Sequence, residues 1–149
     1  IFSGRKGRLT ERNREILDRI TENTKKNQGL VLNICFDYGS REELTQAVRR
    51  IANDVRDGKT DPDEITESDI EKYLYTLGLS NPDLLIRTSG EIRLSNFLLW
   101  QAAYSELYFC RKYWPAFSEK DLSRAIAEYA KRDRRYGGLK GNKDEKKSN

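Results

Sequence analysis

One short stretch of the chain gathers residues that could bind a phosphate group. Residues 87–96 read RTSGEIRLSN, so Arg87 and Arg93 stand six positions apart on either side of a Ser-Gly turn. An arginine presents a planar fork to phosphate oxygens and keeps its charge. Gly90 lets a ligand approach the backbone, and a helix predicted to start after Ser95 would offer free amides to an anion. The residues alone favour a phosphate or diphosphate site and ordinary surface ion pairing equally.

Glu106 is the second feature that could do chemistry, because it interrupts the most apolar part of the sequence. A carboxylate in such surroundings must be paired, bound to a metal or placed at an edge. The simpler interpretation is a partner for one of the arginines. The alternative is a ligand of Mg²⁺, which takes one or two carboxylates together with phosphate oxygens and water.

The composition excludes several other kinds of chemistry. The 149 residues include no histidine, so there is no histidine general base, no Ser-His-Asp triad and no histidine-ligated zinc. The two cysteines, Cys35 and Cys110, are too few for a zinc cage or a disulfide framework, and we expect buried free thiols in a reducing compartment. No apolar run approaches the ~18 residues of a membrane span.

The charges are unevenly distributed, with an acidic middle between two basic ends. This pattern indicates anionic partners at the ends. Nucleic acid is a minor alternative, since the aromatic residues stand in apolar, core-like runs and not along a basic path where bases could stack. The chain begins at Ile1 without an initiator methionine or a secretory signal, so we expect an internal fragment or a processed product.

The elements around the arginine-rich stretch alternate between strands and helices. Apolar runs at 30–36, 84–86 and 107–109 predict strands, the first of them buried on both faces. Helical spacing of apolar residues predicts helices that begin at capping residues. These caps are Thr10, Ser40 with Glu43, Thr66 with Asp69, Ser95, and Ser118 with Asp121.

Strands joined through helices predict an α/β fold with a mostly parallel sheet flanked by helices. In such sheets a ligand binds outside the carboxyl ends of the strands, where the arginine-rich loop after residue 86 is expected. We expect a single α/β domain over residues 1–138. Residues 139–149 are polar and charged with one leucine, so we expect a disordered tail.

The sequence from Asp83 to Phe109, DLLIRTSGEIRLSNFLLWQAAYSELYF, resembles the signature of the cis-prenyltransferases, the undecaprenyl diphosphate synthase family. The strand–turn–helix over 30–52, WPAF at 114–117 and RRYGG at 134–138 are similar to that family too. The resemblance implies a cis-prenyltransferase-like fold. It also implies condensation of isopentenyl diphosphate with an allylic polyprenyl diphosphate, giving a long-chain, undecaprenyl-type lipid carrier for the cell wall.

The resemblance assigns roles to particular residues of this chain. Arg87, Arg93 and Ser95 would hold the diphosphate of isopentenyl diphosphate, Glu91 belongs to the same motif, and Glu106 would help to hold Mg²⁺.

The same family works as a homodimer, in which Arg135 and Gly137 would reach the substrate site of the partner subunit. A cytoplasmic enzyme that touches the membrane transiently through its lipid product is implied.

Two departures from the family pattern matter. The family turn Asn-Tyr-Gly-Gly-Arg reads Asp-Tyr-Gly-Ser-Arg at residues 37–41. The family's Asp-Gly-Asn-Gly-Arg segment, with its catalytic aspartate, does not occur in these 149 residues, so no catalytic residue is assigned and we expect a fold incomplete at its N-terminus. The alternative function is a non-catalytic subunit or fragment of the same fold.

Overall fold

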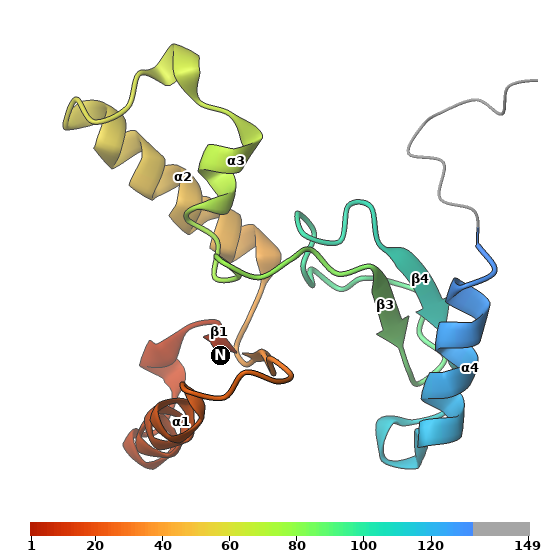
Figure 1. Cartoon of the computed structure of the whole chain (residues 1–149). Coiled ribbons are helices and arrows are strands. Elements are labelled where there is room, and N and C mark those ends of the chain that lie inside the picture. Colours follow the sequence, from red (N-terminus) through yellow and green to blue (C-terminus); the bar gives the residue numbers. More distant parts are fainter. Residues whose placement is uncertain (133–149) are drawn as a thin grey trace, which may run out of the picture. The chain divides into compact units, whose positions relative to one another are not determined.

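The computed structural model describes residues 1–132 and divides into two compact units (Figure 1). The first unit holds residues 1–81 and 94–101, and the second holds, among the described residues, 82–93 and 102–132. The predicted tail at 139–149 lies outside the described residues, as do Arg135 and Gly137. Within residues 1–132, every helix is too short or too polar to span a bilayer.

The first unit starts with a pair of parallel strands. Strand β1 (Phe2–Ser3) pairs with β2 (Ile34–Cys35), Phe2 lying opposite Ile34 and Ser3 opposite Cys35. Between them run a 3₁₀ turn (Lys6–Arg8) and helix α1 (Glu11–Thr24). The predicted cap is confirmed, because the Thr10 hydroxyl accepts a hydrogen bond from the Asn13 amide at 3.3 Å.

The prediction of a strand over 30–36, buried on both faces, is wrong. The ladder extends over Ile34–Cys35 alone, and the side chains of Leu30 and Leu32 are 95% and 65% exposed. The reason is that β1 offers only two residues for pairing. Within the described part of the chain, no strand therefore pairs with residues 30–33, although residues 30–32 are apolar.

Cys35 and Cys110 are free thiols, as expected, but only partly buried.

Helix α2 (Ser40–Arg56) is the longest element of the first unit, and it is followed by a 3₁₀ turn (Pro62–Glu64) and the short helix α3 (Glu67–Glu71). The predicted capping box of α3 is confirmed, since the Thr66 amide donates to the Asp69 carboxylate at 2.9 Å. The helix is shorter than its apolar spacing predicts, and residues 72–79 continue as turns.

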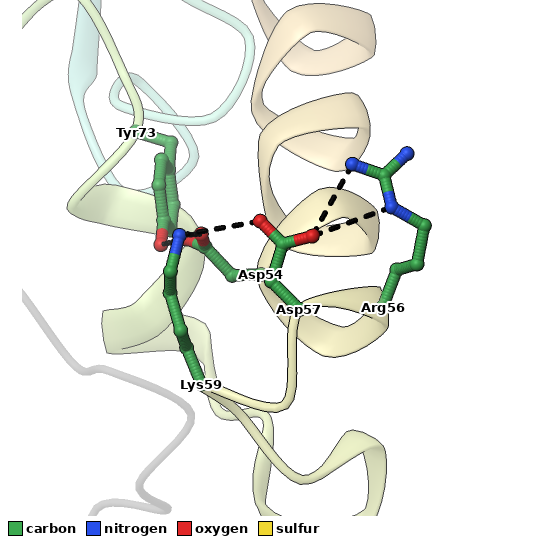
Figure 2. Close-up of polar contacts among 5 residues, drawn as sticks. All are labelled: Asp54, Arg56, Asp57, Lys59 and Tyr73. Carbon is green, nitrogen blue, oxygen red and sulfur yellow. Dashed lines mark hydrogen bonds and ion pairs between the residues drawn. The ribbon is translucent and has the colours of Figure 1, made fainter.

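A polar cluster ties the end of α2 to the turn after α3 (Figure 2). The Lys59 ammonium lies 3.2 Å from the Asp54 carboxylate and 3.3 Å from that of Asp57, while the Tyr73 hydroxyl donates to Asp54. Arg56 also donates to Asp57. The hydrogen bond to Asp54 is the main cause of a raised Tyr73 pKa. The Lys59 and Arg56 side chains are 64% and 71% exposed, so solvent screens their ion pairs, which contribute little to stability.

The second unit carries the strand pair that positions the arginine-rich loop. Strands β3 (Leu84–Arg87) and β4 (Glu106–Phe109) are parallel, with Leu84 opposite Glu106 and Arg87 opposite Phe109. A 3₁₀ turn (Trp114–Ala116) leads to helix α4 (Glu119–Tyr129), which packs on β4. Both predicted strands, the Ser118–Asp121 capping box and the α/β class with parallel strands flanked by helices are confirmed.

Candidate functional site

The loop that follows β3 lies at the carboxyl end of that strand, as the sequence predicts. It folds back along the continuation of β4, because the Ser89 amide donates to the Lys112 carbonyl at 2.7 Å and the Gly90 amide to the Cys110 carbonyl at 2.9 Å. Ser89 and Gly90 have φ angles of +69° and +73°, in the left-handed region that makes the turn. The loop backbone is thereby fixed before any ligand is considered.

The two arginines of this loop differ in their surroundings. Arg87 ends β3 and is half-buried, and no side-chain partner contacts its guanidinium within residues 1–132. Arg93 is exposed and forms an ion pair with Glu91 of the same loop. The side chains of Arg93 and Glu91 are 60% and 40% exposed, so solvent screens the pair and a stronger anion could displace the carboxylate. The loop therefore presents two positive groups to an anionic ligand.

The predicted helix over 95–103, with free amides at its start, is wrong. Ser95, Asn96 and Leu98 have φ angles of +50°, +62° and +46°, which a right-handed helix cannot contain. The segment consists of turns, and no helix dipole acts at Ser95. Ser95 is exposed and belongs to the first unit, whereas the two arginines belong to the second.

Contacts with the start of α2 hold this segment. The Asn96 carbonyl accepts from the Ser40 amide at 2.8 Å, and the Asn96 side-chain oxygen accepts from the Arg41 amide at 2.9 Å. The Leu99 amide donates to the Ser40 hydroxyl at 3.1 Å. The predicted capping box of Ser40 with Glu43 is therefore wrong: the cap position is Gly39, and Asn96 provides the acceptors.

Glu43 lies in the interior of the first unit and is 1% exposed. Its carboxylate accepts from the Tyr38 hydroxyl at 2.5 Å, the Tyr75 amide at 2.7 Å and the Gln101 side-chain amide at 3.2 Å. Burial, followed by the hydrogen bond to Glu43, raises the pKa of Tyr38 well above its ordinary value.

The sequence analysis did not predict that Asn96 caps α2 or that Glu43 is buried, although one feature of the sequence points to each. Glu43 falls on the apolar face of α2 with Ala47 and Ile51, at spacings of four and eight residues. Asn96 is of the residue type that most readily adopts the left-handed conformation outside glycine.

Glu106 stands at the amino end of β4, opposite Leu84. Its carboxylate lies 2.7 Å from the Arg132 guanidinium, which also donates to the Leu107 carbonyl. Glu106 is therefore paired with an arginine, but this arginine is Arg132 and not one of the two in the loop. Arg87 lies three rows further along the ladder, about 10 Å away. Glu106 is therefore apart from the arginine loop, and residues 1–132 contain no group of three or more potential metal ligands.

Asp37, in the turn before α2, is held by two arginines. One of its carboxylate oxygens lies 2.8 Å from the Arg5 guanidinium and 3.2 Å from that of Arg8. The hydrogen bond from Arg5 is the main cause of a lowered Asp37 pKa. The acidic residue is thus accommodated without loss of the turn, which enters α2 at Ser40.

Comparison with known proteins connects this geometry to one family. The family model of undecaprenyl diphosphate synthase matches residues 1–137. The chain belongs to the undecaprenyl diphosphate synthase family. The isoprenyl transferase of Geobacillus kaustophilus is 53% identical over 131 residues, which are 88% of this chain and 51% of that relative. The chain itself spans about half the length of the curated relatives that it matches.

A second relative and two solved structures agree with that membership. The tritrans,polycis-undecaprenyl-diphosphate synthase (geranylgeranyl-diphosphate specific) of Methanopyrus kandleri is 52% identical over 134 residues, covering 90% of this chain and 49% of the relative. Lavandulyl diphosphate synthase from Lavandula x intermedia, solved with dimethylallyl diphosphate, matches with 41% identity and a TM-score of 0.88 over 91% of this chain and 59% of its own. A probable undecaprenyl diphosphate synthase from Campylobacter jejuni matches with 31% identity and a TM-score of 0.78, over 92% and 62%. The cis-prenyltransferase-like fold expected from residues 83–109 is thereby confirmed.

Proposed function

We propose that this chain contributes the isopentenyl diphosphate site of a cis-prenyltransferase. The whole protein condenses isopentenyl diphosphate with an allylic diphosphate to give a long-chain polyprenyl diphosphate of the undecaprenyl type. One observation carries the proposal: Arg87 is half-buried without a side-chain partner within residues 1–132, and Arg93 is held only by an exposed acid of its own loop. Membership of the family and the diphosphate named with the lavandulyl diphosphate synthase structure support this assignment.

In this proposal the loop acts by charge and position. Arg87 and Arg93 bind the diphosphate oxygens, Ser95 donates to them, and Glu91 holds Arg93 until the more highly charged substrate replaces it. Such chemistry depends on charge stabilisation and positioning of the reactants, so the absence of histidine from these 149 residues is no objection to it.

Glu106 alone cannot form a Mg²⁺ site. It is a single carboxylate, Arg132 already contacts one of its oxygens, and residues 1–132 place no cluster of further ligands beside it. Mg²⁺ usually binds one or two carboxylates together with substrate phosphates. Glu106 would therefore contribute to Mg²⁺ binding only together with oxygens of a diphosphate that reaches the amino end of β4, about 10 Å from Arg87 along the ladder, where the ion would neutralise part of that diphosphate's charge. Replacing Glu106 with glutamine should raise the Mg²⁺ concentration needed for diphosphate binding.

The remaining assignments concern the assembled enzyme. Arg135 and Gly137, beyond the described residues, would complete the substrate site of the partner subunit in a homodimer. The enzyme would act in the cytoplasm and touch the membrane through its lipid product.

The test uses Arg93→Ala in the full-length protein, with steady-state kinetics for both substrates. The loss of charge-assisted hydrogen bonds, worth about 1.5–3 kcal/mol, should weaken use of isopentenyl diphosphate by about 10- to 150-fold. The KM for the allylic diphosphate should change little. Arg49→Ala, at an exposed arginine on α2, is the matched control. Unchanged turnover in Arg93→Ala rejects the assignment, and substrate binding without turnover in the unmodified protein indicates a non-catalytic subunit.

A further inference from the structure

The exposed Ser95 is held by an unusual arrangement in the first unit. We propose that Asn96 is a positioning residue, which fixes Ser95 for diphosphate binding by capping helix α2 from a distant part of the chain. The proposal rests on the function proposed above for Ser95. It concerns contacts within the first unit alone, which contains α2 and residues 94–101.

The first step is the cap itself. Helix α2 begins after Gly39, which has no side chain to accept hydrogen bonds from the first amides of the helix. Asn96, 55 residues from Arg41 in sequence, provides the missing acceptors. The Asn96 carbonyl accepts a hydrogen bond from the Ser40 amide at 2.8 Å, and the Asn96 side-chain oxygen accepts one from the Arg41 amide at 2.9 Å. This is the role that a serine, aspartate or asparagine at the cap position usually plays.

The second step is the fit between Gly39 and Asn96. A Cβ atom placed on Gly39 would lie 2.8 Å from the Asn96 side-chain nitrogen, closer than such atoms approach in proteins. Glycine at this position therefore leaves the room that Asn96 occupies. On the other side, the buried Ser40 hydroxyl accepts from the Leu99 amide at 3.1 Å. The start of α2 thus holds the segment on both sides of residue 97.

The third step connects the cap to Ser95. Ser95 and Asn96 are consecutive residues with φ angles of +50° and +62°. Left-handed backbone outside glycine is costly and persists where surrounding contacts impose it. The hydrogen bonds of Asn96 are the contacts that impose it here. Because Ser95 precedes Asn96 directly, these contacts fix the backbone from which the exposed Ser95 hydroxyl projects.

Three substitutions at Asn96 in the full-length protein separate the cap from the backbone conformation. Asn96→Asp keeps an acceptor for the Arg41 amide, so the Kd for isopentenyl diphosphate should stay within about twofold of wild type. Asn96→Gly tolerates a positive φ but removes the acceptor, and should raise that Kd about tenfold, a loss of about 1.4 kcal/mol. Asn96→Ala loses both features and should bind at least as weakly as Asn96→Gly.

The control is Asn53→Ala, an exposed asparagine on the same helix, which should leave the Kd unchanged. If Asn96→Gly binds like wild type, or if Asn96→Asp binds as weakly as Asn96→Gly, the positioning role is rejected. Titration of the purified protein with isopentenyl diphosphate measures all four variants without requiring turnover.

A double-mutant cycle tests the cap independently of substrate. Gly39→Ala should lower the urea midpoint of unfolding in the wild-type background, but much less in the Asn96→Gly background, where the clashing side chain is gone. Additive effects reject the cap. If the unmodified protein binds no isopentenyl diphosphate, the proposed function fails and the positioning role fails with it. In that case the cycle still shows whether Asn96 caps α2, so the two failures are distinguishable.

Discussion

The Tyr38 hydroxyl donates a hydrogen bond of 2.5 Å to the carboxylate of Glu43 inside the first unit. The same carboxylate accepts from the Tyr75 amide and from Gln101. One buried acid thereby joins the turn before α2, the turn after α3 and the end of segment 94–101. Within residues 1–132, hydrogen-bond donors compensate the burial of Glu43 in place of a counter-ion, so each donor matters for stability.

Replacing Glu43 with glutamine should destabilise the protein. The amide nitrogen of glutamine cannot accept from the donors that now face the carboxylate, so at least one buried group loses its partner. We expect the free energy of unfolding to fall by about 1–3 kcal/mol. Urea denaturation measures it, with Glu15→Gln on the exposed face of α1 as the control. Equal stabilities for the two variants would contradict the role given to Glu43.

Stability should also decline in alkaline solution because of Tyr38. Burial and Glu43 hold its pKa above the ordinary value of 10.0 in the folded protein. Above about pH 10 the unfolded chain therefore loses the phenolic proton while the folded chain keeps it, which favours unfolding. Tyr38→Phe should show a shallower decline between about pH 9 and 11. Tyr73 and Tyr75, whose pKa values are also raised, should leave a residual slope.

Asp37 predicts the opposite behaviour in acid. Arg5, and to a lesser extent Arg8, lower its pKa below the ordinary 3.8, so the folded protein keeps this carboxylate ionised longer than the unfolded chain. Its contribution to stability is present above about pH 4 and is lost as the pH falls further. Asp37→Asn should therefore lose less stability on acidification than wild type. A wild-type acid profile of unfolding free energy in this variant would show that Asp37 contributes no pH-dependent stability.

Substitution by alanine should have very different effects on stability at Gly4 and at Gly7. Gly4 has a φ of +135°, and a Cβ atom there would lie 2.0 Å from the Phe36 carbonyl oxygen. Gly4→Ala should lower the free energy of unfolding by about 2 kcal/mol or more, since both the conformation and the space exclude a side chain. Gly7 has nothing within 4 Å of such an atom, so Gly7→Ala should be nearly neutral. Thermal unfolding of the two variants checks the difference.

Signals that are local in sequence predicted their structures well. The caps at Thr10, Thr66 and Ser118 form as expected because each is made by residues three positions apart. Strands β3 and β4 follow from short apolar runs. Their parallel pairing is expected through a helix over 95–103, and it forms although that segment consists of turns. The place of the arginine loop at the carboxyl end of β3 follows from the same reasoning.

The wrong predictions concern residues whose conformation depends on distant partners. The apolar run after Ser95 has the composition of a buried helix, yet Asn96 is held by Ser40 and Arg41, more than fifty residues earlier. The run at 30–36 has the composition of a central strand but meets a partner of only two residues. The sequence alone does not decide between the two interpretations of Glu106, because its partner, Arg132, lies 26 residues away. Neither period nor propensity carries information at such separations.

The boundaries of the two units have a consequence for cutting the polypeptide. The backbone passes from one unit to the other after residues 81, 93 and 101, so neither unit is a continuous stretch of sequence. A break inside the arginine-rich loop, for example after Gly90, would leave each unit divided between both fragments. Neither fragment could then rebuild a whole unit alone, and recovery of structure would require the two pieces to reassociate.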